Sequence, residues 1–232
     1  MTAHVYRILI GASNWLHPAW QEDFYPEDLP EDWQLGFYSN EFPVALIPGD
    51  LWPKIENDIA EWLEDCTDEL KLICEIPKQL ISQSIEDSID VINNYISSLS
   101  VLDGYLLAVV LPVTEINEEL STIIEQIHCP VPLCLDVADS LSSSHDKTAQ
   151  KICAQTHVSL VWHGNDEPIG FELGKMAMTR IDGSKLDMRQ LRDVVETILN
   201  KTSLEQTCVM IVEGEPPDLA TIRNANVILD LF

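Results

Sequence analysis

The sequence has few basic residues and few glycines. Lysine and arginine together account for 13 of 232 residues, against 39 aspartates and glutamates, so the formal net charge is −26. Because binding to a phosphate backbone depends on lysine and arginine replacing its counterions, we expect neither nucleic acid nor an anionic membrane as a partner. The nine glycines form no G-x-G-x-x-G pattern, and there is no P-loop. No nucleotide-binding motif therefore identifies a cofactor.

Long apolar runs, a targeting signal and paired cysteine motifs are also absent. The longest apolar stretch, residues 106–111, is far shorter than the roughly 20 residues of a membrane-spanning helix. Residues 1–15 lack the apolar core and cleavage site of a signal peptide, so we expect a cytoplasmic protein. The six cysteines are scattered, which predicts reduced core residues and no disulfide framework. His128, Cys129 and Cys134 have no second ligand pair at zinc-ribbon spacing, so no metal site is predicted there.

Eight short apolar runs recur along a chain that is 46% hydrophobic and can therefore form a sizeable core. Within each run the apolarity is continuous rather than alternating. This is typical of strands in a parallel sheet, where both faces are covered. The runs are residues 8–10, 44–47, 70–74, 106–111, 133–135, 158–162, 176–181 and 208–212.

Segments with helical periodicity lie between these runs. Apolar residues three and four positions apart predict helices around residues 55–66, 85–99, 116–127 and 188–199. Asp187 and Gln190 have the spacing of a capping box for the last of them. Strands and helices thus alternate along the chain, and 232 residues divided by eight give 29 residues per strand–helix unit. This pattern predicts a single domain over residues 1–232 that folds as a compact (β/α)8 TIM-type barrel. The short gap between residues 162 and 176 predicts a reduced sixth helix, and an open doubly wound sheet is the alternative.

Nine of the sixteen aromatic residues fall between residues 15 and 52, and several belong to recognisable motifs. In their order along the chain, these motifs resemble the opening of the YecE-like family, a domain of unknown function. They are Ile10-Gly-Ala-Ser-Asn-Trp15, residues 24–26 (Phe-Tyr-Pro), residues 29–30 (Leu-Pro), Trp33 and residues 38–42. Residues 106–112, 161–162 and 180–183 are similar to later strands of that family. The resemblance implies a TIM-type barrel.

Several polar positions depart from the family pattern. Its strand lysine corresponds to Glu75, its glutamine before the Leu-Pro-Pro motif to Val110, and its E-F-R-H strand to residues 136–139, which lack the arginine. The glutamate of its second strand is missing from residues 44–48, and its final F-N-N reads Val212-Glu-Gly214. Since these positions fall near strand ends, where a barrel holds its active site, we expect a divergent member with altered or lost chemistry.

In such a barrel the residues that follow the strands gather at one mouth. Carboxylates and a histidine are suited to acid–base chemistry, and the catalytic candidates are Glu75, Asp136 and His163. Aromatic walls with a few polar groups are typical of ligand sites, and the ligand-binding candidates are Asn14, Trp15, His17, Trp20, Tyr25, Arg180 and Asp182. Asp139 and Glu213 are expected at the same mouth.

Alternatives stay open for most of these residues. Arg180 lies inside an apolar strand and must be paired or face the mouth; it either clamps an anionic or carbonyl-bearing ligand or neutralises Glu75 or Asp136 in an ion pair. His163, before Gly164, is a general base or a turn residue. The aromatic candidates form either a ligand platform or part of the core.

Three functions fit this mouth, and the sequence does not decide whether the protein is an enzyme. The first is binding of a small polar ligand. The second is a catalytically degenerate barrel that serves as an interaction module, for which the acidic surface favours a basic protein partner. The third is a hydrolase dependent on a divalent cation, held by the carboxylates and His163.

Overall fold

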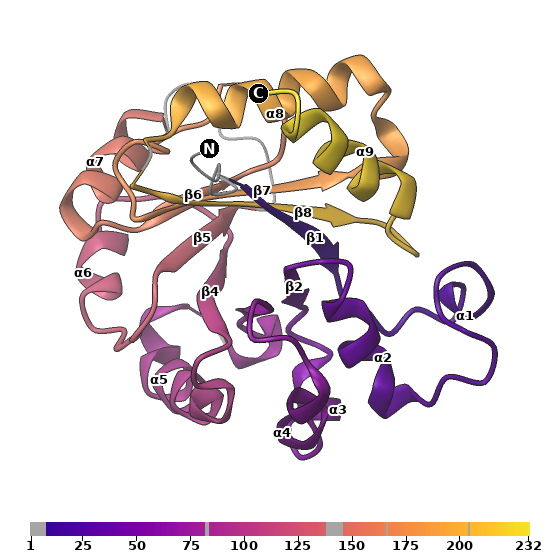
Figure 1. The fold of residues 1–232 in the computed structure, drawn as a ribbon. Coiled ribbons are helices and arrows are strands. Elements are labelled where there is room, and N and C mark those ends of the chain that lie inside the picture. Colours follow the sequence, from indigo (N-terminus) through magenta and orange to yellow (C-terminus); the bar gives the residue numbers. More distant parts are fainter. Residues whose placement is uncertain (1–7, 82–83, 138–145, 166, 204) are drawn as a thin grey trace.

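Eight parallel strands form a closed barrel in the computed structural model, which describes residues 8–81, 84–137, 146–165, 167–203 and 205–232. Each strand is hydrogen-bonded to the next in chain order and the eighth to the first (Figure 1). The strands are β1 (Ile8–Ser13), β2 (Val44–Ile47), β3 (Lys71–Glu75), β4 (Leu106–Val113), β5 (Leu133–Val137), β6 (Ser159–Trp162), β7 (Met176–Asp182) and β8 (Thr207–Glu213). This confirms the predicted TIM-type barrel and places all eight strands where the apolar runs predict them.

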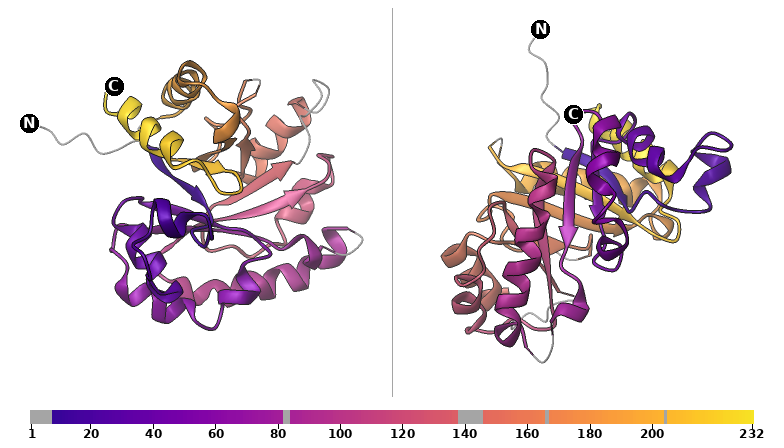
Figure 2. Two further views of the ribbon diagram at one scale, coloured as in Figure 1. Left: turned by 90° about the vertical axis from the view of Figure 1, so that its right-hand side faces the viewer. Right: turned by 90° about the horizontal axis from the view of Figure 1, so that it is seen from below.

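Helices lie outside the barrel and connect successive strands (Figure 2). They are α1 (Trp20–Asp23), α2 (Glu31–Ser39), α3 (Trp52–Ile55), α4 (Ile59–Trp62), α5 (Ile89–Ser98), α6 (Leu120–Ile124), α7 (Asp146–Thr156), α8 (Met188–Lys201) and α9 (Leu219–Leu229). Between β6 and β7 the described residues contain turns and no helix, so the predicted shortening of the sixth connection is confirmed. None of these helices has the length and apolarity needed to cross a bilayer.

Two of the predicted helices are more broken than their periodicity suggests. The stretch around residues 55–66 forms α3, α4 and a 3-10 turn at Leu63–Asp65, because residues 56–58 (Glu-Asn-Asp) include side chains that compete with helical hydrogen bonds. The stretch around residues 116–127 is helical only in α6. In contrast, α8 has the predicted capping box between Asp187 and Gln190.

The apolar interior of the barrel explains the continuous apolar runs. Alternate residues of each strand point inward, and the others pack against the helices. The inward-facing cluster consists of Val44, Leu46, Ile73, Ala108, Val110, Cys134, Val161, Met176, Met178, Val209 and Ile211. Because Met176 and Met178 belong to it, Arg180 follows on the same side of β7, one layer closer to the mouth.

β1 and β2 are paired at only two positions, at the carboxyl end of β1 and in the middle of β2. Beside these pairs the hydroxyl of Tyr38, from α2, lies between the strands: it accepts from the Ala12 amide (2.8 Å) and donates to the Val44 carbonyl (2.7 Å). Gly11 permits this close approach, because a Cβ there would lie 1.8 Å from the Val44 oxygen. The tyrosine hydroxyl therefore replaces part of the backbone hydrogen bonding between β1 and β2.

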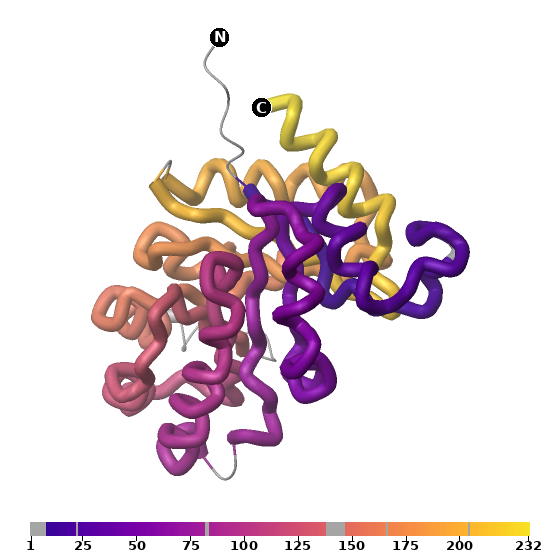
Figure 3. The backbone as a smooth tube through the Cα atoms, turned by 60° about the horizontal axis from the view of Figure 1, so that its bottom comes forward, coloured from indigo at the N-terminus to yellow at the C-terminus, as the bar shows by residue number. Residues whose placement is uncertain are grey.

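The aromatic residues near the amino terminus form a buried cluster around α2. The rings of Trp20 and Tyr38 stack with centroids 6.4 Å apart, and the cluster consists of Trp20, Phe24, Tyr25, Phe37, Tyr38 and Phe42. The segment around α1 projects from the side of the barrel (Figure 1 and Figure 3). The sequence enrichment in aromatics thus belongs mainly to the packing between α1, α2 and the barrel.

Candidate functional site

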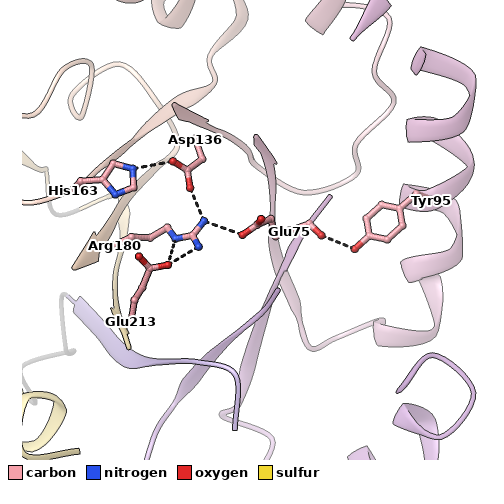
Figure 4. Close-up of polar contacts among 6 residues, drawn as sticks. All are labelled: Glu75, Tyr95, Asp136, His163, Arg180 and Glu213. Carbon is pink, nitrogen blue, oxygen red and sulfur yellow. Dashed lines mark hydrogen bonds and ion pairs between the residues drawn. The ribbon is translucent and has the colours of Figure 1, made fainter. Parts of the chain in front are cut away.

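A layer of charged side chains closes the apolar interior at the carboxyl ends of the strands. Glu75 ends β3, Asp136 lies one residue before the end of β5, Arg180 belongs to the last part of β7, and Glu213 ends β8. The four side chains point toward one another across the mouth (Figure 4). The structure therefore brings together residues that the sequence predicts at one mouth.

Arg180 is the centre of this layer. Its Nε donates to Glu213 Oε1 (2.8 Å), and Nη1 donates to both Glu75 Oε2 (2.9 Å) and Asp136 Oδ2 (2.5 Å). Its Nη2 lies 2.5 Å from Glu213 Oε1. An arginine has five N–H donors, so these contacts leave one, on Nη2, without a partner among the described residues. The geometry thus agrees with the ion-pair alternative for Arg180, and the arginine pairs with three carboxylates.

Opposing effects set the ionisation of this cluster. Burial lowers the pKa of Arg180, but the charges of Glu213, Asp136 and Glu75 more than offset this and raise it above its usual value. Burial raises the pKa of Asp136, but the hydrogen bond from His163 and the charge of Arg180 outweigh it, so the net pKa is lowered. Both groups are therefore charged at neutral pH.

His163 follows β6 and lies at the edge of the layer. Its Nε2 is 2.8 Å from Asp136 Oδ1, and 37% of its side chain is exposed. Because Asp136 is ionised, Nε2 must carry the proton of this hydrogen bond, and Nδ1 has no partner among the described residues. Gly164 comes next with a left-handed backbone (φ 75°) and permits the turn. An imidazole oriented by a carboxylate has the geometry of a general base.

Tyr95 supports the cluster from outside the barrel, and the sequence analysis missed it. Its hydroxyl donates to the Glu75 carbonyl (2.9 Å; Figure 4). Its ring lies edge-on to Trp52, with centroids 6.3 Å apart. This contact holds the end of β3 at the residue whose side chain reaches Arg180. The position of Tyr95 within the helical apolar period could have shown that it faces the sheet, but not which atom it binds.

The candidates in the first loop mainly have structural contacts. Asn14 has a left-handed backbone (φ 68°), and its side chain accepts from the amides of Trp15 (2.7 Å) and Leu16 (2.9 Å). Trp15 is fully buried, and its carbonyl accepts a hydrogen bond from the Tyr25 hydroxyl (2.7 Å). Trp20 is buried in the aromatic cluster. These contacts agree with the packing interpretation of the aromatics.

His17 and Asp182 lie away from the contacts of the charged layer. His17 Nε2 is 3.1 Å from the Ser13 carbonyl, and Nδ1 is 3.8 Å from the exposed carboxylate of Glu215. Asp182 forms an ion pair with Lys185 at 2.8 Å. Hydrogen bonds from Lys185 and from the next turn lower the pKa of Asp182. Neither residue contacts Arg180. Asp139 lies outside the described residues.

Arg180 also occupies the space in which a metal ion would lie. A divalent cation bound by Glu75, Asp136 and Glu213 would need the oxygens that now accept from the guanidinium. Among the described residues no group of three or more histidine, cysteine, aspartate or glutamate side chains is arranged to hold an ion. The donor set of the layer therefore fits an arginine better than a metal.

A separate cavity of about 740 Å³ opens at the other end of the barrel, where β1 and β2 are splayed. Its walls come from the amino ends of β1 and β3, the connection before β2, and α9; it includes none of the charged-layer residues. We place the candidate site at the mouth, because the titratable groups with mutually dependent ionisation lie there.

The fold and this layer define a TIM-type barrel with a charged carboxyl-terminal mouth. The chain belongs to the family described as "Protein of unknown function DUF72", whose model matches residues 9–226. Among solved structures, a DUF72 family protein from Thermotoga maritima MSB8 superposes with a TM-score of 0.73 at 10% identity, over 96% of this chain and 99% of the other.

A DUF72 family protein from Enterococcus faecalis V583 superposes with a TM-score of 0.67 at 14% identity, over 98% of each chain. At these identities the likeness establishes the fold. No curated protein matches the sequence significantly. The comparisons thus agree with the predicted membership of a domain family of unknown function.

Proposed function

We propose that the protein binds a small polar ligand at the mouth of the barrel, in contact with the charged layer. The observation that carries this proposal is a set of polar atoms without hydrogen-bond partners among the described residues. They are His163 Nδ1, Glu75 Oε1, Glu213 Oε2 and one N–H of Arg180 Nη2. Convergent polar groups of this kind fix the orientation of a ligand.

The Asp136–His163 pair gives the proposed site a reactive group. Asp136 fixes the ring through Nε2, so Nδ1 accepts a proton from a bound hydroxyl or ammonium group and returns it later. Arg180 acts as a positioning residue, because it holds Asp136 ionised and in place. A ligand with an acidic proton is therefore favoured over an apolar one.

The hypothesis of a divalent-cation-dependent hydrolase has less support. Arg180 already neutralises part of the charge of the three carboxylates that a cation would bridge. Displacing a guanidinium that holds four contacts would cost much of the binding energy of the ion. We therefore do not retain this hypothesis.

The hypothesis of an interaction module is supported by a different surface. Trp33, on α2, is 57% exposed, and residues 21–33 contain six acidic and no basic residues. A tryptophan among carboxylates fits arginine or lysine side chains through cation–π and ionic contacts. A basic protein partner at this projecting segment is the second candidate function.

The test of ligand binding compares two histidines. We would titrate a set of small polar compounds, both neutral and charged, and follow the imidazole resonances by NMR. A ligand at the mouth shifts His163 and leaves His157 unchanged, because His157 precedes β6 at the opposite end of the barrel. The shift should disappear in Glu213→Gln and persist in Glu205→Gln, an exposed site before β8. A set in which no compound shifts His163 selectively would contradict the proposal.

A further inference from the structure

The charged layer carries more negative than positive charge. Three carboxylates surround the single guanidinium of Arg180, a formal surplus of two negative charges when His163 is neutral. The nearby basic side chain of Lys185 is paired with Asp182 at 2.8 Å. Because the layer lies on an apolar interior, this surplus is screened less than charge on an open surface.

The unpartnered atoms of the layer are mostly acceptors. Glu75 Oε1 and Glu213 Oε2 belong to carboxylates whose other oxygens bind Arg180, and His163 Nδ1 is a third acceptor when the ring is in its neutral form. The single remaining donor is one N–H of Arg180 Nη2. A complementary ligand must therefore supply donors to several acceptors at once.

The occupied arginine makes an anionic ligand unfavourable. Bidentate recognition of a carboxylate or phosphate needs two parallel N–H groups of one guanidinium, and Arg180 has only one left. An anion would also approach three carboxylates, and such like-charge contact is strongly unfavourable. The sequence analysis left two roles open for Arg180, binding of a ligand and an ion pair with carboxylates. Binding of an anionic ligand is the less compatible with these contacts.

We infer that the ligand of this mouth is a small molecule with a protonated amine, held by Glu75 and Glu213 on either side of Arg180. This inference rests on the proposed binding function and adds the chemical class of the ligand. An ammonium group has three donors and a single compact charge, so it can bind a free carboxylate oxygen on either side of the guanidinium. It compensates the surplus charge without displacing the guanidinium. The net charge of −26 adds long-range attraction for a cation.

The experiment uses three probes of equal chain length. They are 1,4-diaminobutane, 1,4-butanediol and succinate. Each contains four carbon atoms, and their ends are ammonium, hydroxyl and carboxylate groups, respectively. Each is titrated into the whole 232-residue chain at constant ionic strength. Calorimetry gives the affinity, and the His163 and His157 resonances give the location. The diamine should bind at least about tenfold more tightly than the diol, shift His163, and leave His157 unchanged, while succinate should not bind.

Two matched variants separate local from general electrostatics. Glu213→Gln removes one negative charge from the layer, and Glu205→Gln removes one from the exposed residues before the same strand. The diamine affinity should fall about tenfold or more in the first and change less than about twofold in the second. Circular dichroism checks that both variants fold. Equal losses in the two would mean attraction by overall charge and would overturn the inference.

The remaining outcomes distinguish this inference from the function on which it rests. If the diol or succinate binds at His163 as tightly as the diamine, the amine assignment is wrong and binding at the mouth stands. If none of the three probes shifts His163, the amine inference is overturned. The proposed function then fails only when the broader set of polar compounds also gives no selective shift.

Discussion

Arg180→Ala should destabilise the protein strongly at neutral pH. The substitution removes the guanidinium that contacts Glu75, Asp136 and Glu213, and leaves three carboxylates around an empty space. About one tenth of the Glu75 and Asp136 side chains is exposed, and about one third of Glu213, so water compensates only partly for the lost contacts. The effect is therefore that of breaking a buried ion pair and not a surface pair.

The expected loss in unfolding free energy is about 3 kcal/mol. Removing one partner of a buried pair typically costs about 3–5 kcal/mol, because the other charge is left uncompensated. Glu213 is more exposed than the other two carboxylates and contributes less, which places the estimate at the lower end. The control is Arg192→Ala on α8, whose pair with Glu196 is largely exposed; its loss should be about 0.5 kcal/mol.

The loss should depend on pH with a defined sign. In the folded protein the pKa of Asp136 lies below its usual value, so the carboxylate contributes stability above its unfolded pKa, about 3.9. That contribution disappears as the pH falls through the lowered folded pKa. In Arg180→Ala the guanidinium no longer holds this pKa down. The difference between variant and wild type should thus be full at pH 7 and shrink as the pH falls below about 4.

Urea denaturation of wild type, Arg180→Ala and Arg192→Ala at pH 7 and at about pH 3, below the unfolded pKa of an aspartate, measures these differences. A loss below about 1 kcal/mol at pH 7, the range of an exposed pair, would refute the ion-pair reasoning. It would mean that Arg180 carries an unfavourable charge at a ligand site, as in the clamp alternative. A loss of equal size at both pH values would refute the electrostatic origin and indicate lost packing instead.

Two further substitutions test the scaffold. Tyr38→Phe leaves the Ala12 amide and the Val44 carbonyl without the hydroxyl that bridges them. At about 1–3 kcal/mol per unsatisfied buried group, the unfolding free energy should fall by about 2–6 kcal/mol; a loss below about 1 kcal/mol would mean that water replaces the hydroxyl. Asp187→Ala removes the acceptor of the α8 capping box with Gln190 and should cost about 1 kcal/mol, restored largely by Asp187→Ser in the same urea assay.

The strands could be predicted from the sequence because each is buried on both faces. Continuous apolar runs such as residues 44–47 and 208–212 have few alternative structures in a chain of strand–helix repeats. Helix continuity was less predictable. The apolar period persists through residues 55–66 although local polar side chains break the helix, since periodicity reports which face is buried and not whether the backbone is continuous.

The residues of the mouth were predictable, but their pairing was not. Glu75, Asp136, Arg180 and Glu213 all fall at the ends of apolar runs, and parallel strands bring such positions to one edge. That Arg180 contacts all three carboxylates depends on the register of β3, β5, β7 and β8, which periodicity does not fix. The role of Tyr95 depends on a long-range contact with a backbone carbonyl, and no local pattern reports such a contact.

The differences from the YecE-like pattern bear on the kind of ligand. Where that pattern has a strand lysine this chain has Glu75, and the arginine of its E-F-R-H strand is missing from residues 136–139. Both changes remove positive charge relative to that pattern. The structure shows Glu75 and Asp136 bound to Arg180 instead of facing other cations. A buried ion-pair cluster contributes little net stability compared with apolar residues of similar volume, so stability alone does not explain a charged layer here. The surplus of negative charge around Arg180 is therefore better explained by the proposed amine ligand than by a contribution to folding.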